Sequence, residues 1–420
     1  MKPWHLAFAA LACASCACSW AQRFSEGGPG ADALGRKEGY PHCVGLTYLN
    51  ESRCRVGALS RFDSLFPAHT IAAPATPSGL RRSAQEPSIA YVHEGRRLSL
   101  DDYMQRHPVS GLLIARGDTI LVERYQYART AKDRLTSFSM AKSITGMLIG
   151  IALHEGAIRS IDDTAESYVP GLKGTEYGRT PIKALLQMAS GVAFQEVYQD
   201  NTSDIYQLAL LTLGQGAGGS LEAVKRFNKR YAQPGERFSY SSAESTVLAL
   251  VVAGATGRNL ADYASEKLWK PLGAEAAASW NIDATGQEIG YAYFNAVLRD
   301  WARLGLMLAH EGQWNGAAIL PREWVLASTT LAPDSPMRSA ATLAGRHSPG
   351  YGYQLWLLDT PRRTFSLRGL RGQFVMVDPD SKLVLVQTAV RHGDDGFADM
   401  ELLNLWRSLV ASPPGDPARN

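Results

Sequence analysis

The chain has 420 residues, of which 45% are hydrophobic and 20% are charged, a composition typical of a soluble globular protein. Its 43 basic and 40 acidic residues leave a formal charge of +3, and no dense block of Lys or Arg is present, so nucleic acid is not an expected partner. The length suits one large domain with two lobes, or two domains.

The first 21 residues have the pattern of a signal peptide. Residues 1–2 supply positive charge, residues 6–18 are apolar and small, and residues 19–21 fit a small-x-small cleavage site. The apolar run is too short to span a bilayer, and no second hydrophobic span follows. We expect a periplasmic or secreted protein without a transmembrane segment after cleavage. The alternative is a lipid anchor on one of the cysteines of this segment, Cys13, Cys16 or Cys18.

Two cysteines, Cys43 and Cys54, would remain after cleavage. In an oxidising compartment this pair predicts one disulfide that closes a short surface loop, with two free thiols as the alternative. Because the sequence has neither CxxC nor HExxH, a metal site is not expected. The three His-Glu-Gly triplets, at His93, His154 and His310, are expected to mark helix ends or turns.

The next segments predict an arm, a hairpin and then helices. Residues 22–88 are rich in Gly, Pro, Ser and Ala, which predicts a loosely structured N-terminal arm. Residues 111–125 form two β-like runs around Gly117-Asp118, a hairpin signal. Helical patterns dominate from Ser139 to about Leu250, and residues 261–273 and 295–312 are amphipathic helices that end at glycine.

After residue 350 the hydrophobic period changes to that of strands joined by turns, with a clear turn at residues 378–381. A helix is expected from about 398 to 410, followed by a flexible tail at 412–420. Pairing of early with late strands predicts an α/β (α+β) fold: one central antiparallel sheet flanked by helices, with a helical lobe (about 140–290) inserted between the early and late strands.

The stretch Ser139-Met140-Ala141-Lys142 holds the first candidate catalytic pair. Ser139 and Lys142 lie on one helix face, and the first turn of a helix favours an alkoxide or an oxyanion. Lys142 could act as a base only if burial or a nearby cation lowered its pKa from about 10.4. The apolar segment 144–153 predicts a buried helix, where an unpaired lysine would be costly. An ordinary helix start with a solvated lysine is the alternative.

Two later motifs could belong to the same site. Tyr240, in Tyr240-Ser241-Ser242, follows a turn rich in Pro and Gly and precedes an apolar helix, so it could point into a cleft; a core aromatic is the alternative. Gly369 and Gly372 lie at the edge of a predicted strand, where a ligand could approach the backbone closely; a bulge or tight turn is the alternative.

The ordered set of SxxK, Tyr-x-x and a glycine-containing strand edge resembles the serine β-lactamase and penicillin-binding-protein superfamily, on its class C side. The stretches "SFSMAKS", "LLQMASGVAFQEVYQDNTSD", "NAVLRDWARLG" and "GLRGQFVMVDP" resemble the 6-aminohexanoate-dimer (nylon oligomer) hydrolases and β-lactamase-fold esterases. The resemblance covers about residues 89–411 and implies a β-lactamase/transpeptidase-like serine hydrolase domain. It implies no metal and no organic cofactor.

The resemblance also implies roles for individual residues. Ser139 is the acylated nucleophile, Lys142 takes its proton or holds the network, and Tyr240 carries a proton to the leaving group. The backbone N–H groups of Ser139 and Leu370 form the oxyanion hole. The implied substrate-binding positions are Tyr198, Asn295, Gly369 and Gly372. For Tyr198 and Asn295 a structural role is equally open.

Departures from the class C pattern bear on the substrate. Ser242 stands where those enzymes carry Asn, and Leu367-Arg368-Gly369 replaces Lys-Thr-Gly, although Arg368 or Arg371 could replace the lost charge. We therefore expect weak or no β-lactamase activity and hydrolysis of a small-molecule carboxylic ester or linear amide. The alternatives are a D-Ala peptidase and a penicillin-binding-like binder or sensor that does not turn over.

Overall fold

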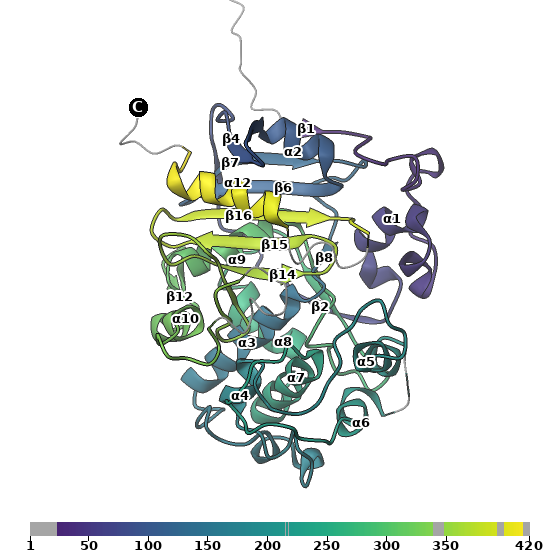
Figure 1. The fold of residues 1–420 in the computed structure, drawn as a ribbon, viewed down its shortest axis with the longest axis vertical. Helices are drawn as coiled ribbons and strands as arrows, with labels where there is room; N and C mark the ends of the chain where they lie inside the picture. The colour runs from purple at the N-terminus through teal and green to yellow at the C-terminus, as the bar shows by residue number, and fades with distance from the viewer. Residues whose placement is uncertain (1–22, 215, 217, 339–347, 393–398, 415–420) are drawn as a thin grey trace, which may run out of the picture.

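The computed structural model describes residues 23–214, 216, 218–338, 348–392 and 399–414, so the expected signal peptide and the end of the expected tail lie outside the described residues. Its main feature is an eight-stranded, mostly antiparallel sheet (Figure 1). The strands are β1 (Arg23–Phe24), β3 (Arg81–Arg82), β6 (Val109–Arg116), β7 (Thr119–Tyr125), β13 (Trp356–Leu357), β14 (Phe365–Gly369), β15 (Gln373–Asp378) and β16 (Leu383–Ala389). Their order is β1-β7-β6-β16-β15-β14-β13, with β3 paired to β7.

The predicted pairing of early with late strands is confirmed. Strand β6 runs antiparallel to β16, from Arg116 opposite Leu383 to Val109 opposite Ala389. The predicted hairpin around Gly117-Asp118 is also confirmed, since β6 and β7 pair across it. The helical segment between β7 and β13 is therefore an insertion. It follows the first strands of the main sheet in the chain and precedes the last ones.

Helices cover both faces of this sheet, and alternate strand residues face each layer. On one face, α2 (Leu100–Arg106) and α12 (Met400–Ala411) pack with Leu112 and Ile114 of β6. On the other, α9 (Leu298–Ala309) packs against β6, β15 and β16, and Leu113 and Ala115 point into that core. The hairpin of β4 (Ala90–His93) and β5 (Arg96–Ser99) lies against α12. The helices predicted near 295–312 and 398–410 are thus confirmed.

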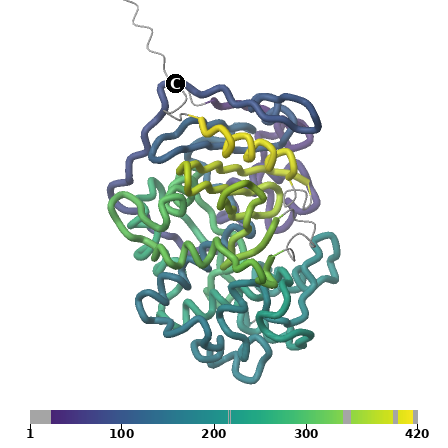
Figure 2. The backbone as a smooth tube through the Cα atoms, turned by 60° about the vertical axis from the view of Figure 1, so that its left-hand side comes forward, coloured from purple at the N-terminus to yellow at the C-terminus, as the bar shows by residue number. Residues whose placement is uncertain are grey.

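The inserted lobe lies beside the sheet, at the opposite end of the molecule from α12 (Figures 1 and 2). Its helices are α3 (Met140–His154), α4 (Ile182–Leu186), α5 (Asp204–Thr212), α6 (Gly219–Lys225), α7 (Ser242–Thr256), α8 (Leu260–Ala264) and the π-helix η7 (Ser265–Trp269). Helices α3 and α7 pack on each other at its centre. Within the described ranges, no helix has the length and apolar character needed to cross a membrane.

A second, four-stranded sheet lies next to the start of α3. Its order is β2-β9-β10-β8, formed by β2 (Ala68–Ile71), β9 (Ala278–Asn281), β10 (Phe294–Ala296) and β8 (Leu135–Thr136). The remaining elements are the small hairpin of β11 (Gln313–Trp314) and β12 (Ala317–Ala318) and the helix α10 (Arg322–Thr329). Because β8 immediately precedes α3, this sheet fixes where that helix begins.

The expectation of a loosely structured arm at residues 22–88 is wrong. The segment folds into short helical turns: η1 (Arg36–Glu38), η2 (Gly45–Leu49), η3 (Ser52–Cys54), α1 (Arg55–Leu59) and η4 (Phe62–Ser64). Cys43 and Cys54 are bonded in a disulfide, and Tyr48 and Phe62 are buried. The expectation gave weight to the Gly and Pro content and none to a few large apolar side chains. Burial of those side chains against the core orders the arm.

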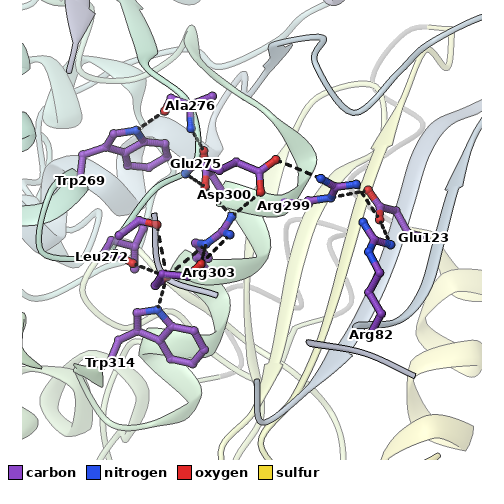
Figure 3. A network of polar contacts seen from close by, with 12 residues as sticks. Arg82, Glu123, Trp269, Leu272, Glu275, Ala276, Arg299, Asp300, Arg303 and Trp314 are labelled. Atoms are coloured by element: carbon purple, nitrogen blue, oxygen red, sulfur yellow. Dashed lines mark hydrogen bonds and ion pairs between the residues drawn. The ribbon is translucent and has the colours of Figure 1, made fainter. Parts of the chain in front are cut away.

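Buried ion pairs join α9 to the main sheet (Figure 3). Glu123 of β7 is fully buried and forms ion pairs with Arg299 of α9 at 2.8 Å and with Arg82 of β3 at 2.7 Å. Arg299 also reaches Glu275, which pairs with Arg303 one helical turn further along α9. Glu123 is fully buried, so removal of both of its arginine partners would leave a costly uncompensated charge.

The three His-Glu-Gly triplets lie where they were predicted. His93 ends β4 at the turn into β5, His154 is the last residue of α3, and His310 follows the last turn of α9. In each case the glycine has a positive φ, which ends the element at low cost.

Candidate active site

Ser139 and Lys142 lie together in the interior. Lys142 is 1% exposed, and its Nζ lies within hydrogen-bond distance of Ser139 Oγ at 3.0 Å, Ser242 Oγ at 3.0 Å and the Tyr291 carbonyl oxygen at 3.1 Å. Ser139 is at the N-cap of α3, yet its side chain makes no capping hydrogen bond. The alternative of an ordinary helix start with a solvated lysine is therefore wrong.

The turn before Ser139 fixes the start of α3. Ser137 N donates to the Phe294 carbonyl at 2.8 Å, and Ser137 Oγ accepts from Phe294 N at 2.9 Å, so this turn is tied to β10. Phe138 has a φ of 43°, an unusual value for a residue with a large side chain. Strain of this kind persists only where the surroundings hold it, and it is concentrated at functional sites.

Tyr240 and Ser242 approach the same group from the start of α7. The Tyr240 ring centroid is 5.0 Å from Lys142 Nζ, and the ring packs against Trp356 at 5.3 Å and Tyr351 at 6.2 Å. Ser242 is the first residue of α7 and places its hydroxyl on Lys142. Because α3 packs on α7, residues about 100 positions apart converge on one amine.

Glu196 is a member of the group that the sequence interpretation missed. One of its carboxylate oxygens accepts from Ser242 Oγ at 2.6 Å and from the Tyr198 hydroxyl at 2.7 Å, and the other accepts from Ser242 N at 2.8 Å. Tyr198, predicted to contact substrate, is thus brought to the site through this carboxylate. The sequence around it, "FQEVYQD", gave no signal that set this acidic residue apart.

The tip of the β14–β15 hairpin lies against the turn before Ser139. A Cβ on Gly369 would be 2.2 Å from the Ser137 carbonyl oxygen, so only glycine allows this approach. Gly372 has a φ of 92° in the hairpin turn. Across the described part of the chain, the N–H groups of Ser139 and Leu370 donate to no backbone oxygen. Both are therefore available to a substrate oxygen, as an oxyanion hole requires.

Comparison with known proteins places this geometry in a family. The family model described as Beta-lactamase matches residues 97–405, most of the chain. The chain belongs to the beta-lactamase family. A 6-aminohexanoate-dimer hydrolase of Paenarthrobacter ureafaciens is 27% identical over 385 residues, which cover 84% of this chain and 91% of the relative.

Solved structures agree on the fold of this β-lactamase-family chain. A structure from Bacillus anthracis, titled as a 6-aminohexanoate-dimer hydrolase, superposes with a TM-score of 0.74 at 22% identity, covering 87% of this chain and 94% of the other. EstCE1, titled a hydrolase with promiscuous acyltransferase activity, gives a TM-score of 0.56 at 18% identity, covering 72% and 93%. The predicted β-lactamase/transpeptidase-like fold is confirmed. The protein is a serine hydrolase that acts on amide or ester bonds.

Three other residues considered for substrate binding, Asn295, Arg368 and Arg371, contact protein groups in the structure. Asn295 is fully buried, and its amide nitrogen donates to Asn281 Oδ1 at 3.0 Å and to the Tyr293 carbonyl at 3.1 Å. Arg368 lies over the Trp356 ring at 5.3 Å, and Arg371 donates to the Arg391 carbonyl at 2.9 Å. All three side chains thus interact with other residues of the protein. A contact between Asn295 and the substrate stays a prediction.

No group of three or more His, Cys, Asp or Glu residues that could hold a metal ion occurs in the part of the chain that the structure describes. A serine hydroxyl hydrogen-bonded to a buried amine is an arrangement suited to nucleophilic attack on a carbonyl carbon.

Proposed function

We propose that this β-lactamase-family enzyme cleaves a carboxylic ester or linear amide through an acyl-enzyme on Ser139. The observation that carries the proposal is the 3.0 Å hydrogen bond between Ser139 Oγ and the buried Lys142 Nζ. A nucleophile within hydrogen-bond reach of a base, with that base oriented by further groups, is the signature of covalent catalysis. Here Ser242 Oγ and the Tyr291 carbonyl orient the base.

In the first step Lys142, in its neutral form with its two N–H groups on Ser242 Oγ and the Tyr291 carbonyl, accepts the hydroxyl proton of Ser139 as Oγ attacks the substrate carbonyl carbon. The negative oxygen of the tetrahedral intermediate accepts from the N–H groups of Ser139 and Leu370. The bond to the alcohol or amine then breaks, and the leaving group departs with a proton delivered through Tyr240, with Lys142 resupplying it. In the second step water attacks the acyl carbon, gives a proton back through the same pair, and frees the acid and the Ser139 hydroxyl.

The substrate class follows from the relatives and from the departures within the motifs. A relative that covers 84% of this chain is a 6-aminohexanoate-dimer hydrolase, which supports a linear amide or a comparable ester as substrate. Ser242 replaces the class C asparagine, Leu367 stands in the place of the lysine, and Arg368 lies over the Trp356 ring. We therefore expect little turnover of β-lactams.

We also infer that the mature enzyme is exported and begins near residue 22. The charge, apolar run and small residues of positions 1–21 support a signal peptide, and the Cys43–Cys54 disulfide is consistent with an oxidising compartment. N-terminal sequencing of the protein from a bacterial periplasm tests this: an intact Met1 on the folded, exported protein would contradict cleavage.

The first experiment is a hydrolysis panel with purified mature enzyme and its Ser139→Ala variant. The panel holds a short-chain p-nitrophenyl ester, a 6-aminohexanoate linear dimer, a chromogenic cephalosporin and a D-Ala-D-Ala peptide. The matched control is Ser143→Ala, because Ser143 lies on the same helix but bonds to the Gln354 carbonyl. We expect turnover of the ester or dimer that is lost only in Ser139→Ala.

Other results would redirect the assignment. Turnover of the D-Ala-D-Ala peptide alone would make the protein a cell-wall peptidase. A mass adduct on Ser139 that persists without turnover would make it a binder or sensor. Activity that survives Ser139→Ala would refute Ser139 as the nucleophile.

A further inference from the structure

Two aromatic residues of the N-terminal arm, Tyr48 and Phe62, pack directly on Tyr293. The Phe62 ring stacks on the Tyr293 ring, with centroids 4.5 Å apart and planes 6° from parallel. Tyr48 meets Phe62 edge-on at 5.5 Å, and the hydroxyl groups of Tyr48 and Tyr293 interact. All three side chains are buried. The Cys43–Cys54 disulfide closes the loop that carries Tyr48.

Tyr293 is connected to both members of the nucleophile pair. The carbonyl of Tyr291, two residues earlier, accepts from Lys142 Nζ at 3.1 Å. Phe294, the next residue, exchanges two hydrogen bonds with Ser137 in the turn before Ser139. A displacement of Tyr293 would therefore move an acceptor of the lysine and the turn that carries the serine.

Tyr293 needs external support to hold this position. Its φ is 64°, a left-handed conformation that is strained for a residue other than glycine. A strained residue of this kind stays in place only where its surroundings determine its conformation. The stacked ring of Phe62 and the neighbouring Tyr48 provide that support from a segment more than 200 residues away in the sequence.

The arm is also attached on the side of the predicted oxyanion hole. Arg55 of α1 donates to the Val390 carbonyl at 3.3 Å, and Arg371, which follows Leu370, donates to the neighbouring Arg391 carbonyl at 2.9 Å. Figure 1 shows α1 beside the main sheet, near β15 and β16. The arm therefore contacts the end of β16 next to the hairpin tip, as well as the Tyr293 turn.

We propose that the arm segment 43–62 belongs to the catalytic apparatus, with Tyr48 and Phe62 as positioning residues that act through Tyr293 on Lys142 and Ser139. The inference rests on the proposed function, because it assigns these residues to the acylation step at Ser139. It gives the disulfide a role in holding the Tyr48 loop against the active site.

The test compares Phe62→Leu with Phe66→Leu in the mature, disulfide-bonded enzyme. Phe66 is the matched control, because it lies in the same arm and its ring meets Phe62 rather than Tyr293. Burst kinetics with the p-nitrophenyl ester measure acylation separately from turnover. We expect Phe62→Leu to lower the acylation rate and kcat about tenfold or more, since small misplacements of reacting groups carry costs of this size, with KM within about twofold. Phe66→Leu should stay within about twofold in both.

A second variant, Tyr48→Phe, keeps the test decisive if Phe62→Leu does not fold. It retains the ring and removes only the hydroxyl beside Tyr293, so kcat should fall several-fold while the near-UV circular dichroism is unchanged. Tyr40→Phe removes a different buried hydroxyl of the arm, bonded to the Glu26 carbonyl, and should leave kcat unchanged. Equal acylation rates in each variant and its control would overturn the inference. If Ser139→Ala were active, the proposed function itself would fail, which is a separate result.

Discussion

Replacement of Glu196 by glutamine tests whether the catalytic amine is held by a network that reaches the surface of the lobe. Glu196 accepts from Ser242 Oγ, from Ser242 N and from the Tyr198 hydroxyl at 2.6–2.8 Å. Because the Ser242 hydroxyl proton points to the carboxylate, a lone pair of Ser242 Oγ remains for Lys142 Nζ. Glutamine offers one acceptor oxygen and one NH2 group, so at least one of these donors loses its partner.

The expected cost follows from the hydrogen bond that is lost. A hydrogen bond to a charged group contributes about 1.5–3 kcal/mol net, and the lower end applies because Glu196 is only partly buried. About 1.4 kcal/mol of lost transition-state stabilisation corresponds to a tenfold lower kcat/KM. We therefore expect Glu196→Gln to lower kcat/KM for the ester roughly tenfold, and Ser242→Ala to lower it similarly.

Steady-state kinetics on the two single variants and the double variant provide the assay. Because both residues act on Lys142 through one chain of hydrogen bonds, the double variant should lose little more than either single variant. Glu222→Gln is the control, since Glu222 pairs with Lys225 on the exposed face of α6. Fully additive losses, or an unchanged rate in Glu196→Gln, would refute the reasoning.

Two further predictions concern the pH dependence of stability and the close contact between Gly369 and the Ser137 carbonyl. Burial raises the pKa of Glu244 from 4.5 to about 8, so its protonated form stabilises the fold below pH 4.5 and that contribution is lost as the pH rises to about 8. The melting temperature should fall over this range, and Glu244→Gln should flatten the fall. Gly369→Ala places a Cβ against the Ser137 carbonyl and should cost about 1–3 kcal/mol together with most of the activity, whereas Gly79→Ala, in open space, should change neither. Thermal unfolding and ester hydrolysis measure both, and an active, fully stable Gly369→Ala enzyme would contradict the close approach.

The sequence was sufficient to predict the sheet and the pairing of Ser139 with Lys142 on one helix face, because both leave strong local patterns. The alternation of apolar and polar residues around Gly117 and the spacing of Ser139 and Lys142 can both be read from consecutive residues. Glu196 left no such pattern, since an acidic residue in a polar loop is ordinary and only the tertiary contact with Ser242 distinguishes it. The arm was misjudged for a related reason: its composition is that of a loop, while its order comes from a few buried aromatic rings.

Backbone strain around the site also depends on tertiary contacts, so no pattern in the sequence indicates it. Phe138, Met188, Tyr293 and Arg371 all have positive φ values, although none is a residue that favours them. Phe138 precedes Ser139, Arg371 follows Leu370, Tyr293 lies two residues from the acceptor of Lys142, and the Met188 carbonyl accepts from the residue before Tyr240. Each proposed catalytic group thus adjoins one strained turn. Packing from the lobe, the β14–β15 hairpin and the arm must offset the free-energy cost of these strained turns. Segments far apart in the chain are therefore needed to hold Ser139 Oγ and Lys142 Nζ at 3.0 Å.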